Sequence, residues 1–188
     1  VCSTAKEREY NRDHKVGSIC LHNKLTKQFS KDLVDIENRF REDPRNIDGK
    51  ELNKYIDQSS KAATTIVNSA EVIFTTTASI LHKHLRSIEG VPVIIMDEAT
   101  QSSEPLTMIA LGVKGCRKLA LVGDPEQLSV FTNVRTLKTS LYQRVIDHSI
   151  LTKPHLLNTQ YRMHPEICEY SNTEFYKGQL RNGITAED

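Results

Sequence analysis

Two adjacent carboxylates, Asp97 and Glu98, directly follow the apolar run from Val93 to Met96. A short apolar run predicts a buried strand, so both charges would stand at the carboxyl end of that strand. A carboxylate at the edge of a core is costly unless a partner compensates its charge. A divalent cation on the phosphates of a nucleotide is such a partner, and the second carboxylate can then handle an attacking water. The pair therefore indicates phosphoryl-transfer chemistry, with an acidic cap on a surface loop as the simpler alternative.

Three further polar clusters also follow short apolar runs. They are Thr75–Thr77, Gly123 with Asp124, and Gln160–Arg162, which follow the runs 72–74, 118–122 and 156–157. Each cluster alone has a plain explanation: a capped strand end, an ordinary turn, or an arginine paired with a surface acid. In open α/β sheets, however, ligands collect at the carboxyl ends of the strands. The joint placement of the four clusters therefore predicts one shared ligand site.

The elements that would position these clusters alternate between strands and helices after Glu71. The strands are expected at 72–74, 92–96, 117–122 and 156–157, and the helices at 78–87, from 103 onward, at 137–148 and at 165–175. Pro105 and Pro165 fall in the first turns of two of these helices, where proline is favoured. Nearly continuous apolar strands between helices predict an α/β fold with a parallel sheet covered on both faces.

The segment before Glu71 has a different pattern. A short strand is expected near Val16, Ile19 and Leu21. Two helical stripes follow, the first made of Leu25, Phe29, Leu33, Ile36 and Phe40, and the second of Leu52, Ile56, Ala63, Ile66 and Val67. The turn-forming stretch 42–49 separates them, which predicts an antiparallel helical hairpin. The stripes are narrow, which favours a protruding arm over two helices that cover the sheet.

Composition narrows the class of protein. The chain has 188 residues, of which 38% are hydrophobic and 26% charged, with a net charge of +1, as in an ordinary globular domain without uniformly basic character. No apolar run reaches the roughly 20 residues of a membrane span, so we expect no membrane partner. The absence of an initiator Met and of a signal peptide suggests a fragment.

The cysteines are widely spaced. Cys2, Cys20, Cys116 and Cys168 form no Cys-x-x-Cys pair, which favours free thiols in a reducing compartment, the cytoplasm or the nucleus. Cys20 with His22, and His82 with His84, have no partners at the spacing of zinc ligands, so we expect no structural zinc site.

The motifs together resemble the superfamily 1 helicases, in particular the up-frameshift-type branch known from nonsense-mediated mRNA decay. Residues 97–105 are similar to the Walker B segment of that family, and 121–128 to its Gly-Asp-x-x-Gln-Leu motif. Residues 160–167 and 175–184 resemble the next two conserved runs. Residues 18–23 resemble the approach to its inserted helical subdomain. The resemblance implies a partial RecA-like P-loop NTPase domain over 1–188, with an inserted two-helix hairpin at 24–68.

The resemblance also implies ATP and Mg²⁺ as cofactors, and it assigns four catalytic residues. Asp97 would hold Mg²⁺, through water. Glu98 would orient and deprotonate the attacking water. Gln127 would contact the γ-phosphate and link the nucleotide to the nucleic-acid side. Arg162 would supply positive charge where phosphoryl transfer develops negative charge.

Binding residues are implied in the same way. Gly123, Asp124 and Tyr161 would contact the nucleotide, with Tyr161 stacked on its base. Single-stranded nucleic acid is the implied partner, with RNA favoured over DNA, and protein partners would bind through flanking domains. The residues expected to face the nucleic-acid backbone are Thr75, Thr76, Thr77 and Ser79.

Two departures from the family pattern limit what the chain can do alone. Ser129 follows Leu128 where the family usually has proline. A Walker A loop is also absent from the sequence, because the single Gly-Lys pair, Gly49 and Lys50, lacks the other required residues. We therefore expect the later part of the first motor domain, which holds half of an ATP site and is inactive by itself.

The expected function is that of a fragment of an ATP-dependent nucleic-acid helicase. The alternative is a helicase-like scaffold that binds nucleic acid or protein and hydrolyses nothing. Another P-loop ATPase or a kinase is a third possibility, in which the cluster 160–165 would have no place.

Overall fold

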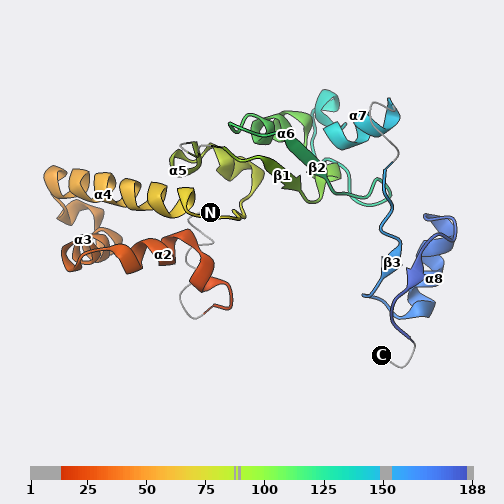
Figure 1. Ribbon diagram of the computed structural model, residues 1–188, viewed down its shortest axis with the longest axis horizontal. Coiled ribbons are helices and arrows are strands. Elements are labelled where there is room, and N and C mark those ends of the chain that lie inside the picture. Colours follow the sequence, from red (N-terminus) through yellow and green to blue (C-terminus); the bar gives the residue numbers. More distant parts are fainter. Residues whose placement is uncertain (1–13, 87, 89, 149–153, 186–188) are drawn as a thin grey trace. The chain divides into compact units, whose positions relative to one another are not determined.

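The computed structural model describes residues 14–86, 88, 90–148 and 154–185. The chain forms two compact units (Figure 1). The first unit comprises the residues up to Asp97 together with Glu104–Val122, and the second comprises Glu98–Ser103 together with the residues from Gly123 onward.

A parallel strand pair forms the sheet of the first unit. Strand β1 (Val93–Met96) pairs with β2 (Lys118–Leu121), with Val93 opposite Lys118 and Met96 opposite Leu121. The pairing extends one step further, because the amide of Val122 donates to the carbonyl of Met96 at 2.8 Å. Both strands were predicted, and the structure confirms them and their parallel direction.

Helix α6 (Glu104–Leu111) connects the two strands and begins next to Ser103, as predicted. Its buried residues are Thr107 and Ala110, and the helix contacts the 3₁₀ helix η3 (Thr77–Leu81). The helix expected at 78–87 is instead η3 followed by the short α5 (Lys83–Arg86), and Ser87 lies outside the described residues.

The strand expected at 72–74 does not form within the described part of the chain. These residues pair with no described strand, and the side chains of Val72 and Phe74 are 69% and 78% exposed. An apolar run becomes a strand only where a neighbour accepts its backbone hydrogen bonds, and the described strands offer none here.

The helical segment contains three helices rather than the expected two. They are α2 (Leu21–Gln28), α3 (Lys31–Glu42) and α4 (Gly49–Asn68), with the 3₁₀ turn η2 (Pro44–Asn46) between the last two. Ser30 breaks the first predicted helix, because its backbone is extended and its hydroxyl accepts from the amide of Leu33 at 3.4 Å. This N-cap starts α3 as a separate helix.

The short strand expected near residues 16–21 is also wrong. Residues 17–19 form the 3₁₀ turn η1 (Gly17–Ile19), and Leu21 already begins α2. The side-chain amide of buried Asn23 donates to the carbonyl of Gly17 at 2.9 Å, which folds this turn back onto the helix.

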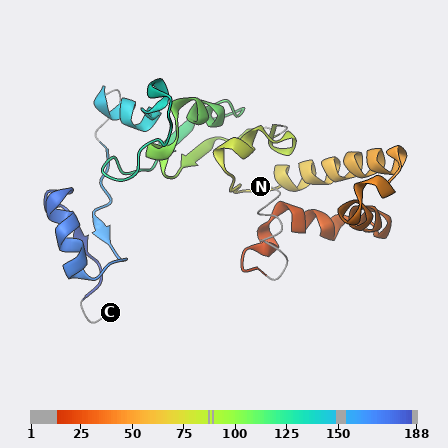
Figure 2. The same cartoon turned by 180° about the vertical axis from the view of Figure 1, so that it is seen from behind.

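The helices of this segment pack along their apolar stripes. Helix α2 lies beside α4 in both views (Figure 1, Figure 2), and Phe29 meets Tyr55 edge to face with ring centroids 5.8 Å apart. Leu33 and Ile36 of α3 are buried, as are two residues of α4, Ala63 and Val67. No helix in the described part of the chain combines the length and the apolar character needed to cross a membrane.

The second unit contains short elements around longer turns. They are the 3₁₀ helices η4 (Ala99–Gln101) and η5 (Arg135–Leu137), the helices α7 (Leu141–Asp147) and α8 (Pro165–Glu174), and the strands β3 (Thr159–Gln160) and β4 (Arg181–Asn182), which pair in parallel. Helix α8 begins at Pro165, as predicted. Helix α7 is shorter than expected, because Ser140 caps it by accepting from the amide of Gln143.

The strand predicted at 156–157 forms three residues later, as β3. Leu157 is 77% exposed, so burial does not hold this pair in the sheet. Backbone hydrogen bonds align β3 with β4. The amide of Arg181 donates to the carbonyl of Asn158, and the amide of Gly183 donates to the carbonyl of Gln160.

Candidate functional site

The backbone turns sharply where β1 ends. Asp97 is exposed, and Glu98 adopts a left-handed conformation with φ of 52° and ψ of 41°. Such a conformation is uncommon for a residue other than glycine and often marks a functional position. It directs Ala99 and Thr100 into the interior, where they are 1% and 5% exposed, and leaves the Glu98 side chain at the surface. The carboxylate of Glu98 accepts a hydrogen bond from the side-chain amide of Gln101 at 3.1 Å.

The turn that follows β2 lies against the turn that follows β1. A Cβ atom on Gly123 would stand 3.1 Å from both the amide nitrogen and Cγ2 of Thr100, so only glycine fits without a shift. The carbonyl of Gly123 accepts from the hydroxyl of Tyr142 at 3.0 Å. Burial, and then the charge of Asp124, raise the pKa of Tyr142, so this phenol remains a donor.

Asp124 organises the loop after Gly123. Its Oδ1 accepts from the backbone amide of Glu126 at 3.0 Å, which closes the turn. Its Oδ2 accepts from the Gln127 side-chain amide at 2.7 Å and from the Tyr176 hydroxyl at 2.6 Å. Burial, and then the hydrogen bond to Asp124, raise the pKa of Tyr176, so its proton stays in the bond.

A second hydrogen-bond centre lies in the turn after β3. The side chain of Gln160 makes four hydrogen bonds. Its oxygen accepts from the backbone amides of Arg162 and Met163, both at 2.8 Å. Its nitrogen donates to the carbonyl of Met163 at 2.8 Å and to Oδ1 of Asn182 at 2.7 Å. Gln160 therefore builds the turn that carries Tyr161 and Arg162.

Tyr161 and Arg162 are presented at the surface of this turn. The ring of Tyr161 occupies the space where a Cβ of Gly183 would stand, yet the residue remains 70% exposed. The guanidinium of exposed Arg162 has no carboxylate at ion-pair distance among the described residues. An aromatic face and a cation are thus both accessible to a ligand.

The structure brings some of the predicted residues together. Gly123, Asp124 and Gln127 form one cluster, and Glu98 belongs to the segment that Gly123 contacts through Thr100. Tyr161 and Arg162 form a second group on the turn after β3.

The remaining predicted residues lie in the first unit. Asp97 follows β1, and the threonines precede or begin η3. Thr76 donates to the hydroxyl of Ser79 at 2.8 Å, and Thr75 donates to the carbonyl of Thr76 at 3.2 Å. Both bonds are local to the segment that leads into η3, whose first residues receive no side-chain cap.

Three residues that position the site were not predicted: Tyr142, Tyr176 and Asn182. Their partners lie 19, 52 and 22 positions away in the sequence, so no local spacing reveals them. The runs that contain Tyr176 and Asn182 were recognised as motifs, which was the one available signal.

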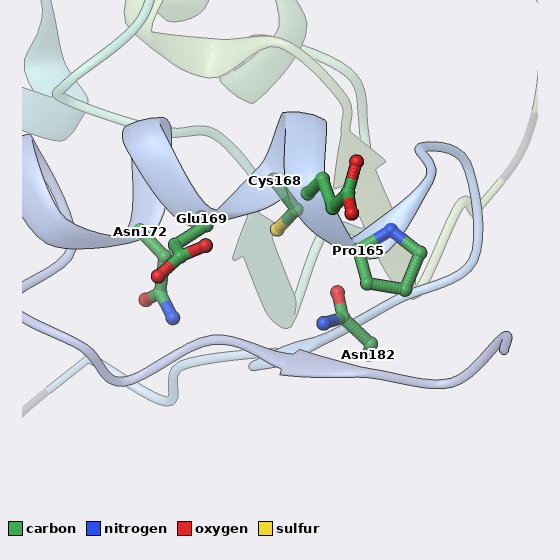
Figure 3. A pocket seen from close by; sticks show the side chains of 6 residues that line it. Pro165, Cys168, Glu169, Asn172 and Asn182 are labelled. Atoms are coloured by element: carbon green, nitrogen blue, oxygen red, sulfur yellow. The ribbon is translucent and has the colours of Figure 1, made fainter. Parts of the chain in front are cut away.

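A shallow cavity of about 230 Å³ lies between α8 and β4 (Figure 3). Pro165, Cys168, Glu169 and Asn172 line it from the helix, and Asn182 lines it from the strand. The Asn172 side chain is engaged at both ends, since it accepts from the amide of Leu180 and donates to the carbonyl of the same residue. The Cys168 thiol is free, as are those of Cys20 and Cys116, whereas Cys2 lies outside the described residues.

Two family models match the chain, and each is described as an AAA domain. The first matches residues 2–133 and the second matches residues 137–188. Together they cover almost the whole sequence, and the boundary between them falls just before α7.

Three fungal proteins are similar in sequence to this chain over nearly its full length. One from Saccharomyces cerevisiae, provisionally named ATP-dependent RNA helicase ECM32, is 40% identical over 100% of the chain. The ATP-dependent helicase NAM7 of the same yeast is 31% identical over 98%, as is the regulator of nonsense transcripts 1 homolog of Neurospora crassa.

The chain spans 17–19% of the length of these three relatives. The matched models identify the fold as part of a RecA-like P-loop NTPase domain, and the parallel strand pair is consistent with such a domain. The chain therefore belongs to the AAA-domain family, within the up-frameshift-type branch of the superfamily 1 helicases.

Proposed function

We propose that this chain is part of an ATP-hydrolysing motor that moves along single-stranded nucleic acid and unwinds duplexes. The carrying observation is the close contact of Gly123 with Thr100, which joins the turns that follow two parallel, paired strands. The carboxyl ends of such strands are where α/β domains of this kind bind nucleotides. The relatives, named as ATP-dependent helicases, support the same activity.

Asp97 is the residue we assign to Mg²⁺. Its carboxylate is exposed at the end of β1, and carboxylate oxygen is the donor that Mg²⁺ prefers, often through water. The ion would neutralise charge on the phosphate oxygens during transfer.

Glu98 is the residue we assign as the general base. Its left-handed backbone buries the next two residues, which anchors the turn while the carboxylate stays accessible. Its carboxylate accepts a hydrogen bond from the exposed side chain of Gln101, and a bound water can take the place of that donor. Gln127 would act beside it, on the water or on the γ-phosphate.

The second group binds the nucleotide and stabilises the transferred charge. Tyr161 offers an exposed ring face for the base, and Arg162 offers an accessible cation for the developing negative charge. Thr75–Thr77 and Ser79 would donate hydroxyl hydrogen bonds to backbone phosphates, contacts that carry no sequence information. We favour RNA as the strand, and the cytoplasm or nucleus as the location.

The proposal is tested by Glu98→Gln in the full-length protein. The amide keeps the shape of the side chain and loses the base, so the ATPase rate should fall about 10²–10⁴-fold while ATP binding is retained. Glu71→Gln, at an exposed glutamate outside the site, is the matched control and should leave the rate unchanged.

Near-normal turnover by Glu98→Gln would overturn the assignment of the base. A full-length protein that binds nucleic acid but hydrolyses no ATP would be a scaffold instead of a motor. The 188-residue chain alone should show no turnover, because its sequence contains no phosphate-binding Gly-rich loop.

A further inference from the structure

One oxygen of Asp124 joins two segments that are distant in the sequence. Its Oδ2 accepts from Gln127, three residues away, and from Tyr176, 52 residues away. Asp124 lies in the first region matched by a family model and Tyr176 in the second. The hydrogen bond of Tyr176 is therefore a direct link between those two regions.

The carboxylate also fixes which way the Gln127 amide points. An ionised carboxylate can only accept hydrogen bonds, so the nitrogen of the Gln127 side chain must face Asp124. The amide oxygen is then directed away from Asp124, and Gln127 as a whole is exposed. In this arrangement Gln127 offers an acceptor, which suits it to orient a water rather than to donate to a phosphate.

Tyr176 strengthens this arrangement. Bonds of 2.6 and 2.7 Å to one charged oxygen are in the short, charge-assisted class. Because the Tyr176 ring is partly buried beyond α8, its hydroxyl holds the carboxylate in one rotamer, and the carboxylate holds the amide. Without the hydroxyl, Asp124 can rotate and Gln127 loses its fixed orientation.

We propose that Tyr176 is a positioning residue that, through Asp124, orients the Gln127 amide and so couples the segment after α8 to ATP hydrolysis. The inference rests on the proposed function. A water is oriented only for the chemical step, so loss of this link should lower kcat and leave KM for ATP nearly unchanged.

The test is Tyr176→Phe in the full-length protein, which keeps the ring and removes only the hydroxyl. We expect kcat to fall about tenfold, as for loss of one charge-assisted hydrogen bond, with KM changed less than about twofold. Tyr170→Phe is the matched control, since this tyrosine lies on α8, is 69% exposed and should tolerate the change.

A double-mutant cycle identifies the route of the effect. In a Gln127→Ala background, Tyr176→Phe should cause no further loss, because the residue it positions is gone. An equal loss in both backgrounds would overturn the proposal, and so would a Tyr176→Phe enzyme indistinguishable from Tyr170→Phe. If Tyr176→Phe unfolds the protein, Asp124→Asn serves in the same cycle and carries the same criterion.

Failure of the underlying function would look different. If the wild-type protein has no ATPase activity, the proposed function itself is wrong. An active wild type that responds to Glu98→Gln but not to Tyr176→Phe removes only the coupling.

Discussion

The side-chain amide of Gln160 donates to Oδ1 of Asn182 at 2.7 Å, and so ties the turn after β3 to the neighbouring strand β4. The same side chain closes its own turn through Arg162 and Met163. The Gln160 side-chain oxygen accepts two hydrogen bonds and its nitrogen donates two, so the hydrogen-bonding capacity of this amide is used in full. The position of Arg162 therefore depends on the side chain of Gln160.

Gln160→Ala should remove these bonds and loosen the turn. We expect the free energy of unfolding to fall by about 1–2 kcal/mol, since each net hydrogen bond contributes modestly. In the full-length protein we also expect a larger loss of kcat than the stability change explains, because Arg162 is no longer held. Denaturant unfolding and steady-state kinetics measure the two effects. Gln179→Ala, at an exposed glutamine after α8, is the control, and equal effects of both variants would contradict the prediction.

Gly183→Ala should displace the ring of Tyr161, because the added methyl group would occupy the same space. If Tyr161 stacks on the nucleotide base, KM for ATP should rise about five- to tenfold with kcat retained. This rise corresponds to losing part of the free energy of a full stacking contact. Gly49→Ala is the control, since a Cβ there meets nothing within 4 Å. A similar rise caused by Gly183→Ala in a Tyr161→Ala background would show that the ring is not the target.

The elements that the sequence predicted best carry their own signals. Residues 93–96 and 118–121 were predicted because each lies in a short, largely apolar run, and the parallel pairing of the two runs satisfies their backbone groups. Pro165 marks the start of α8 because its fixed φ suits the first helical position. The runs 72–74 and 156–157 are equally apolar, yet their fate depends on neighbouring strands that composition does not reveal.

The sequence suggests residue types for the candidate site, but it does not reveal the hydrogen bonds between them. Asp97 and Glu98 were proposed because charged side chains directly after an apolar run require an explanation, whereas Gln127 was proposed from the family resemblance alone. The left-handed backbone of Glu98 and the bond from Tyr176 to Asp124 follow from the folded chain alone. The break at Ser30 was accessible in principle, because serine three residues before an apolar helical position is a capping pattern.

The ion pair between α3 and α4 should make stability depend on pH. Arg39 donates to both oxygens of Glu51, at 2.8 and 3.2 Å. The hydrogen bond to Arg39 lowers the pKa of Glu51 from its usual 4.5 in the folded state. This contribution is therefore present above pH 4.5 and is lost as the pH falls through the lower pKa of the folded state.

Glu51→Gln should accordingly lower Tm by about 1–3 °C at pH 7, because the pair is exposed and screened, and by less at pH 3, below the usual pKa of the carboxyl. Thermal melts followed by circular dichroism at the two pH values check this. Glu174→Gln, at an exposed glutamate with no described ion pair, is the control. A difference that persisted unchanged at pH 3 would show that packing, and not the charge, is responsible.

The helical segment 24–68 is proposed as an arm that contacts the strand or controls its access. Its arginines are engaged in ion pairs: Arg39 with Asp35 and Glu51, Arg41 with Glu37, and Arg45 with Asp43. Lys24, Lys27 and Lys31 are exposed, and the described residues provide no ion pair for them. These three lysines, with Lys50 and Lys54 of α4, are therefore cations of the arm available for phosphate contacts.

Replacing residues 24–68 with a short Gly/Ser linker in the full-length protein should reduce strand affinity modestly and unwinding more strongly. Helix α4 contacts α2 and α3 within the arm and also α5 outside it, so circular dichroism should confirm that the linker variant stays folded. Changing Lys24, Lys27 and Lys31 together to alanine should lower the slope of log affinity against log salt by up to about 2, as three lost contacts with a single strand would. Alanine at Lys114, Lys118 and Lys138, which are also exposed but lie outside the arm, is the charge-matched control. A linker variant that binds and unwinds like the wild type would leave the arm a purely structural insertion.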